Sequence, residues 1–214
     1  MSENTVTAFF GGSFDPPHPG HLGVAQGALN SGKCDRVLWV PAYAPPHKPG
    51  RDRMPFAARF DMVLEMISGI PCMAVSDIEA RLELDPSYTI SILEKLEKEI
   101  EGTLALLIGE DSLAQLHTWY RAKELVERYL ILTYPRTGCR ATKEYLSQFW
   151  SEKECEKLLS GMLDGKFFEI SSTNLRFSME KSDKWDNIIS MTPEPAAIYC
   201  RRHGLYHSFF RSST

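Results

Sequence analysis

The chain has 214 residues, of which 43% are hydrophobic and 24% are charged, and its formal net charge is −4 at neutral pH. This composition is typical of a globular protein with a sizeable core and excludes a disordered chain. The slight acidic excess argues against a dedicated nucleic-acid binder, although a few local cations would suffice for phosphate ligands. The length fits one domain spanning residues 1–214.

Targeting signals and metal-binding spacings are missing from the sequence. The five cysteines are scattered without a C-x-x-C pair, which favours reduced thiols over a disulfide framework or a zinc site. The first residues do not resemble a signal peptide, and no run approaches the ~18 apolar residues of a membrane span. We therefore expect a cytoplasmic protein with no nucleic-acid partner, no membrane partner and no protein-held metal. The choice between monomer and homo-oligomer stays open.

The first half of the chain alternates strands and helices. Residues 5–10 are apolar and predict a buried strand, which Gly11 and Gly12 end, and residues 20–30 predict a helix closed by Gly32. The pattern then predicts, in chain order, a strand at 36–40, a Pro-rich loop at 42–55, a helix at 56–67 and a weaker strand at 73–78.

The second half continues this alternation up to residue 133. It predicts a helix at 89–101, a strand at 104–108, a short helix at 122–127 and a strand at 129–133. Residues 135–166 look like an inserted or peripheral segment with a helix near 153–162, and the remaining elements are a strand at 167–170 and helices from 171 and at 193–203. We expect an α/β fold with a Rossmann-like, open and mostly parallel sheet, helices on both faces, and a small helical part at about 171–214.

The most informative stretch is residues 11–21 (GGSFDPPHPGH), between the first strand and the first helix. Ligands of open α/β sheets bind at this edge, and the N-terminus of the helix favours phosphate. His18 and His21 are three residues apart, so both imidazoles can point from that terminus toward one phosphate and stabilise charge at phosphorus. An isolated H-x-x-H is more often a pair of unrelated surface histidines. The stretch fits neither the Walker loop nor G-x-G-x-x-G.

Residues 11–22 resemble the signature of the H-x-G-H nucleotidyltransferase superfamily, and the full string is similar to that of the nicotinate-mononucleotide adenylyltransferase family. The resemblance implies that His18 and His21 are catalytic, because in that family both histidines bind ATP phosphates and stabilise the transition state. It also implies ATP contacts at four positions of the loop, which are Gly11, Gly12, Ser13 and Phe14.

A second motif lies at residues 171–176 (SSTNLR), where Ser172 or Thr173 can cap a helix. On its own this pattern favours a plain capped helix with a solvent-facing arginine. The segment resembles the second signature of the family, Ser-Ser-Thr-x-x-Arg. That resemblance implies that Ser172, Thr173 and Arg176 bind ATP and that Arg176 is catalytic, clamping the departing pyrophosphate.

Further segments also resemble family elements. The resemblance assigns Gly109 and Asp111 to the adenosine side, and Lys48, Thr89 and Trp119 to the mononucleotide. An aromatic face suits a pyridine ring, although Trp119 packed in the core and a merely solvated loop around Lys48 are the alternatives. The tail at 193–206 fits the closing helix of the family, whereas two positions depart from its pattern near the mononucleotide side, namely Asp85 and Ser91.

The resemblance implies transfer of AMP from ATP to nicotinate mononucleotide, in which a 5′-phosphate oxygen attacks the α-phosphorus in line and pyrophosphate leaves. Catalysis would come from positioning and charge stabilisation, and Mg²⁺ would accompany ATP, held mainly by the nucleotide and water. The rivals are another H-x-G-H transferase, acting on phosphopantetheine or forming a CDP-alcohol, and a non-catalytic nucleotide-binding regulator. The residues do not separate nicotinate from nicotinamide mononucleotide, and the resemblance favours the acid.

Overall fold

The computed structural model describes residues 5–43, 54–83, 86–136, 138, 141–164, 172–173, 175–176, 194–203 and 205. Within these residues one sheet of parallel strands has the order β3-β2-β1-β4-β5. The strands are β1 (Val6–Gly12), β2 (Arg36–Pro41), β3 (Met73–Val75), β4 (Thr103–Gly109) and β5 (Leu130–Tyr134). The strand order reverses between β1 and β4, and ligands of open α/β sheets bind outside the carboxyl ends of strands at such a point.

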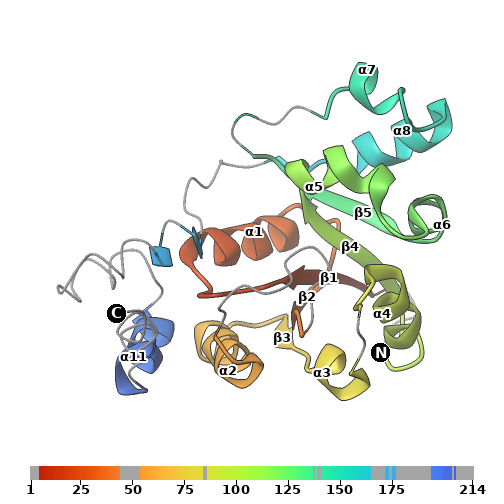
Figure 1. The fold of residues 1–214 in the computed structure, drawn as a ribbon. Coiled ribbons are helices and arrows are strands. Elements are labelled where there is room, and N and C mark those ends of the chain that lie inside the picture. The colour runs from red at the N-terminus through yellow and green to blue at the C-terminus, as the bar shows by residue number, and fades with distance from the viewer. Residues whose placement is uncertain are drawn as a thin grey trace, which may run out of the picture.

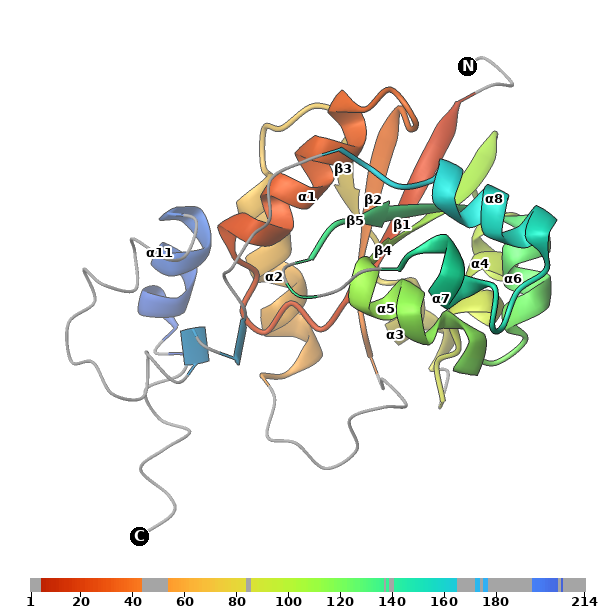
Figure 2. The same ribbon diagram turned by 90° about the horizontal axis from the view of Figure 1, so that it is seen from above.

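Helices cover both faces of the sheet, as the sequence predicts (Figures 1 and 2). Helices α1 (Pro19–Asn30) and α2 (Phe56–Ile67) lie on one face. The elements between β3 and β5 and after β5 pack mainly on the other face, and they are α3 (Ile78–Leu82), α4 (Thr89–Leu96), α5 (Glu110–Gln115), the 3-10 helix η1 (Leu116–Thr118), α6 (Ala122–Arg128), α7 (Lys143–Leu146) and α8 (Glu152–Ser160).

The central strands are apolar on both faces, which a covered parallel sheet requires. In β1, Phe10 packs into the core beneath α1 and α2, while its neighbour Phe9 packs into the core beneath α4 and α6. In β4, Leu107 and Leu106 divide in the same way. The carboxyl ends of β1 and β4 are therefore held rigidly between two cores.

Two predicted element boundaries are wrong. The strand predicted at 73–78 ends at Val75, and Ile78 instead begins α3, where the carbonyl of Asp77 accepts the first helical bond from Arg81 N–H. The helix predicted at 89–101 ends at Leu96, because tighter bonds such as Glu99 N–H to Leu96 O close its last turns. The other strands and helices predicted before residue 134 are confirmed to within two residues.

The segment predicted as inserted or peripheral, 135–166, contributes buried side chains to the core within its described residues. Trp150, Cys155 and Leu158 are buried in the same cluster as α4 and α6. Helix α8 lies where a helix near 153–162 is expected, whereas α5 and α7 are additions that no sequence pattern announced. The strand predicted at 167–170 lies outside the described residues.

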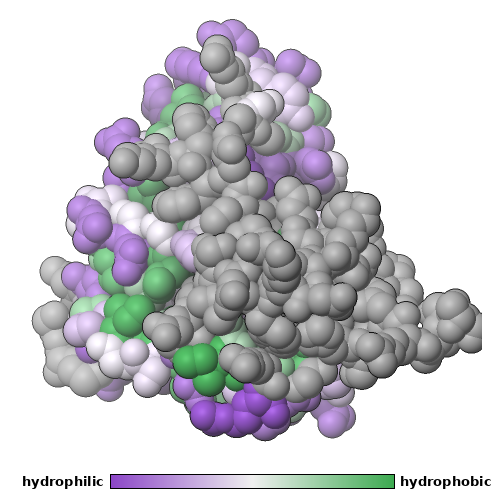
Figure 3. Space-filling view, turned by 90° about the vertical axis from the view of Figure 1, so that its left-hand side faces the viewer, coloured by the Kyte–Doolittle hydropathy of each residue, from purple (hydrophilic) through white to green (hydrophobic). Residues whose placement is uncertain are grey.

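The last described helix, α11 (Glu194–Arg202), packs on α2. Tyr199 Oη donates a hydrogen bond to Asp61 Oδ2 at 2.7 Å, and the Cys200 thiol is buried against Met62. On this side of the molecule, hydrophobic side chains form patches among hydrophilic ones (Figure 3). None of the described helices is long and apolar enough to cross a membrane.

Candidate active site

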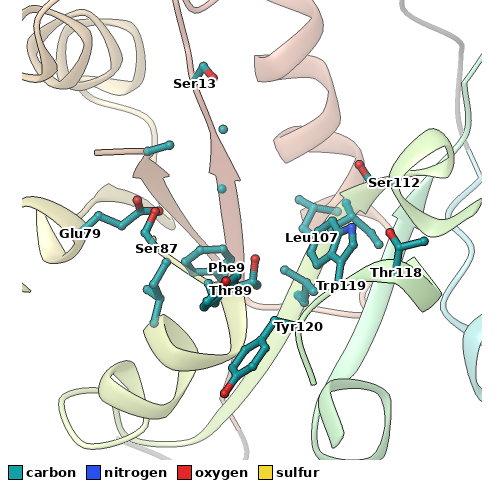
Figure 4. Close-up of a pocket in the computed structure, with 17 residues that line it drawn as sticks. Phe9, Ser13, Glu79, Ser87, Thr89, Leu107, Ser112, Thr118, Trp119 and Tyr120 are labelled. Atoms are coloured by element: carbon teal, nitrogen blue, oxygen red, sulfur yellow. The ribbon is translucent and has the colours of Figure 1, made fainter. Parts of the chain in front are cut away.

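A pocket of about 560 Å³ opens at the carboxyl ends of β1 and β4 (Figure 4). Glu79 and Ser87 lie together at one end, and Trp119 faces them from the opposite side. The lining residues come from both central strands, from α3 and α4 and from the chain around η1, and they are Phe9, Gly11, Gly12, Ser13, Ala42, Glu79, Ser87, Tyr88, Thr89, Ile92, Leu106, Leu107, Ile108, Ser112, Thr118, Trp119 and Tyr120.

Five of the candidates from the sequence line this pocket: Gly11, Gly12 and Ser13 from the ATP set, and Thr89 and Trp119 from the mononucleotide set. The two glycines have a steric reason to be glycines. A Cβ on Gly11 would lie 2.8 Å from the Phe9 ring, and one on Gly12 would lie 2.9 Å from the Phe14 ring. Trp119 is partly exposed, so it packs against the core beneath α4 and also presents surface to the pocket.

His18 and His21 form a stacked pair at the start of α1, with ring centroids 3.6 Å apart and planes inclined by 28°. His18 is the residue that precedes the helix, and its backbone N–H donates to His21 Nδ1 at 3.2 Å. Because Nδ1 is the acceptor, the proton of neutral His21 lies on Nε2. The helix start therefore fixes the tautomer that can offer an N–H donor.

Both imidazoles are held neutral at pH 7. Burial, together with the smaller effect of the nearby Arg136 guanidinium, lowers the pKa of His18 to about 4. Burial, the His18 ring and Arg136 hold the pKa of His21 well below its usual range. A neutral imidazole retains one N–H donor, so each ring can still hydrogen-bond to a phosphate oxygen.

Two residues of the second motif, Ser172 and Arg176, donate hydrogen bonds to the loop at residues 11–21. Arg176 Nη1 donates to the carbonyl of Asp15, and Ser172 Oγ donates to the carbonyl of Pro16 at 2.9 Å. Arg176 Nη2 also donates to Thr173 Oγ1 at 3.2 Å. The guanidinium is thus tethered beside the segment that leads into His18, although 161 residues separate Arg176 from Asp15 in the chain.

The remaining candidates lie outside the pocket lining. Phe14 is 2% exposed and packs against Trp39, so its side chain is not open to ATP. Gly109 precedes α5, where a Cβ would collide with the Asp111 carboxylate, and Asp111 lies 3.5 Å from Arg136. Lys48 falls outside the described residues, so its predicted contact with the mononucleotide stays a prediction.

Sequence reasoning missed Arg136, a cation that follows β5. It lies close enough to lower the pKa of both histidines, and its backbone N–H donates to the buried carboxylate of Glu110 at 3.1 Å. Its position two residues after the end of a strand would have been the signal, since the carboxyl ends of all the parallel strands meet at this edge.

Arg59 and Glu79 were missed as well. Arg59 is 2% exposed, and its guanidinium donates to the carbonyls of Ser13 and Met54, each at 2.9 Å. An arginine at an apolar helical spacing in residues 56–67 would have indicated a buried role. Glu79 accepts the Tyr43 N–H at 2.9 Å, and burial raises the pKa of its carboxyl; no sequence pattern pointed to it.

Comparison with known proteins agrees with this arrangement. Residues 9–177 match the family model described as cytidylyltransferase-like, so the chain belongs to this class of proteins. A relative from Gloeobacter violaceus, named a probable nicotinate-nucleotide adenylyltransferase, is 35% identical over 92% of this chain and 94% of its own. One from Caldicellulosiruptor bescii with the same name is 34% identical over 93% of this chain and 97% of its own. The chain is a member of the nicotinate-nucleotide adenylyltransferase family.

Solved structures share the fold. The nicotinic acid mononucleotide adenylyltransferase of Plasmodium falciparum, complexed with NaAD, superposes with a TM-score of 0.75 at 17% identity, over 95% of this chain and 98% of the other. The same enzyme complexed with APC gives a TM-score of 0.73 at 18% identity, again over 95% and 98%. At these identities the likeness supports the Rossmann-like fold itself.

Proposed function

We propose that this protein transfers AMP from ATP to nicotinate mononucleotide, forming nicotinate adenine dinucleotide and pyrophosphate. One observation carries this proposal beyond family membership. The hydrogen bond from Arg176 to the Asp15 carbonyl brings the second motif to the loop that ends in the stacked histidines, and the first residues of this loop line the pocket. A guanidinium, two imidazole donors and a helix N-terminus are then available to one triphosphate.

The residues act by binding and by stabilising charge. A 5′-phosphate oxygen of the mononucleotide attacks the α-phosphorus in line, and the bond to the departing pyrophosphate breaks. The N–H donors of His18 and His21 stabilise the charge on the phosphoryl oxygens, and Arg176 holds the pyrophosphate. No side chain needs to become a nucleophile.

The pocket suits the mononucleotide. Its volume of about 560 Å³ lies within the usual range for small-ligand sites, and Trp119 offers an aromatic face for the pyridine ring. Thr89 lines the same pocket. The preference for the acid over the amide rests on the names of the relatives.

We also propose that Mg²⁺ enters with ATP. Among the described residues no group of three or more His, Cys, Asp or Glu side chains could hold a metal. Asp15 is 1% exposed, and its carboxylate lies 3.9 Å from Arg176, so it is not open to a cation. These residues fit an ion carried by the triphosphate and water, which would neutralise phosphate charge.

The free thiols among the described cysteines support the cytoplasm as the compartment.

Pyrophosphate release from ATP tests the proposal. The protein is offered nicotinate mononucleotide, nicotinamide mononucleotide and phosphopantetheine in separate reactions, and CTP with an alcohol phosphate in a fourth. We expect the fastest release with nicotinate mononucleotide. Faster release with phosphopantetheine or with CTP would assign the chain to another H-x-G-H transferase. Nucleotide binding without release in any reaction would make it a regulator.

A further inference from the structure

Two elements on the same face of the sheet form opposite parts of the pocket wall. Tyr88, Thr89 and Ile92 belong to the start of α4, whereas Trp119 and Tyr120 belong to the connection between η1 and α6. The rings of Tyr88 and Tyr120 stack across the two elements with centroids 4.4 Å apart and planes inclined by 27°. The position of Trp119 in the pocket therefore depends on how firmly this connection is held against α4.

Arg121 directly follows that connection and reaches back to α4. Its Nη2 lies 2.8 Å from Glu94 Oε1, and its Nη1 lies 3.2 Å from Glu94 Oε2, so the contact is bidentate. Its Nε also donates to Glu124 Oε2 in α6 at 2.8 Å. The paired side chains of Arg121 and Glu94 are 33% and 31% exposed, which places them partly out of solvent. A bidentate guanidinium–carboxylate contact fixes orientation as well as distance.

The backbone of Arg121 is held in an unusual conformation. Its φ is +51°, in the left-handed region that favours glycine, yet the residue is an arginine. A non-glycine residue keeps this conformation only where its surroundings impose it. The contacts around Arg121 are the two carboxylates that receive the guanidinium and the hydrogen bond from Leu125 N–H to the Arg121 carbonyl at the start of α6.

A second arginine in the same cluster provides a comparison. Arg128, the last residue of α6, lies 2.8 Å from Glu94, 3.0 Å from Glu124 and 2.8 Å from Glu97. It shares two partners and the same 33% side-chain exposure with Arg121. Its backbone, however, is separated from Trp119 by the whole of α6.

We propose that Arg121 and Glu94 act as an ion-pair clamp that positions Trp119 and Tyr120 against α4 and so sets the shape of the mononucleotide subsite. This inference rests on the proposed function. Arg121 is a positioning residue, since it acts through Trp119 and does not line the pocket. Without the clamp the connection relaxes and the aromatic wall shifts, while the loop at residues 11–21 and Arg176 keep their contacts.

Steady-state kinetics of Arg121→Gln and Arg128→Gln test the clamp. We expect Arg121→Gln to raise the KM for nicotinate mononucleotide about fivefold or more, because a small displacement of a positioning group has a large kinetic cost. The KM for ATP should stay within about twofold of wild type. Arg121→Gln and Arg128→Gln should lower the thermal midpoint by similar amounts. Arg128→Gln should nevertheless leave both KM values near wild type. An unchanged mononucleotide KM in Arg121→Gln, or the same rise in both variants, overturns the clamp.

The partner residue gives an independent measurement if Arg121→Gln folds poorly. Glu94→Gln should raise the same KM, and the double variant should raise it by less than the product of the two single effects, as expected for residues that share an interaction. Effects that simply add would overturn the pairing. An assay of the wild-type protein distinguishes failure of the clamp from failure of the proposed function. If the wild type releases no pyrophosphate with any mononucleotide, the proposed function is wrong, whatever the variants show.

Discussion

At the start of α1 the protein keeps two imidazoles uncharged beside a guanidinium. His18 is 4% exposed, and burial outweighs other influences in lowering its pKa to about 4. A neutral imidazole keeps one N–H donor for a phosphate oxygen and one nitrogen that can accept a hydrogen bond. The lowered pKa also makes the free energy of unfolding depend on pH, because the unfolded chain binds a proton at His18 more readily than the folded chain does.

The sign of that dependence follows from the lowered pKa. The ordinary pKa is 6.5 and the folded value is about 4, so the contribution of His18 is complete above pH 6.5 and is lost as the pH falls toward 4. The shift corresponds to about 3 kcal/mol. Denaturant unfolding of wild type and His18→Gln at pH 7.5 and 4.5 checks this, since wild type should lose more stability than the variant. Equal losses would show that His18 does not titrate in this way.

His18 also has a kinetic signature under the proposed function. His18→Ala should lower kcat by about a hundredfold, because one N–H donor to the transition state is removed, with a smaller change in the KM for ATP. Pyrophosphate release under saturating substrates measures it. Turnover near wild type would remove His18 from catalysis.

Trp119 has two roles that one substitution separates. Trp119→Ala should raise the KM for the mononucleotide about tenfold through loss of the aromatic face, while the KM for ATP acts as the internal control. Initial rates with each substrate varied in turn give both values. A KM for the mononucleotide equal to that of wild type would leave Trp119 as a core residue only.

At the scale of elements, α2 is linked by a hydrogen bond to the loop at residues 11–21. The buried guanidinium of Arg59 spans from Met54, before the helix, to the Ser13 carbonyl in the loop after β1. The spacing of apolar residues predicts the helix at 56–67 correctly. It does not show that one charged residue on the buried face connects the helix to the loop.

Arg59→Met should lower the free energy of unfolding by about 2–4 kcal/mol, since two carbonyl groups lose their buried donor. Urea unfolding measures this loss, and Arg36→Met, at an exposed arginine of β2, serves as the matched control. Equal stability of the two variants would mean that water replaces the guanidinium at both carbonyls.

Across the whole molecule, residues far apart in the chain meet at one edge of the sheet. The Arg176 contact joins the C-terminal motif to the N-terminal loop, and α11 is buried against α2. A ligand that binds at this edge and contacts both the loop at residues 11–21 and Arg176 should therefore raise the free energy of unfolding.

A non-hydrolysable ATP analogue at about 100 times its Kd should add about 2.7 kcal/mol to wild-type stability. Arg176→Ala should gain much less at the same concentration, because the guanidinium that holds the phosphates is gone. Thermal melts with and without the analogue measure the difference, with Arg202→Ala, an exposed arginine of α11, as control. If the analogue stabilises Arg176→Ala and Arg202→Ala equally, Arg176 does not contribute to nucleotide binding.

The sequence alone determined the alternation of strands and helices, the glycine turn after β1 and the two phosphate motifs. These are local properties, set by hydrophobic period, turn residues and helix starts. The end of β3 at Val75 and the burial of Trp150, Cys155 and Leu158 were decided by tertiary packing. So were the meeting of Arg176 with Asp15, the Arg59 support and the Arg121–Glu94 pair, because each joins groups whose distance depends on how separate elements pack.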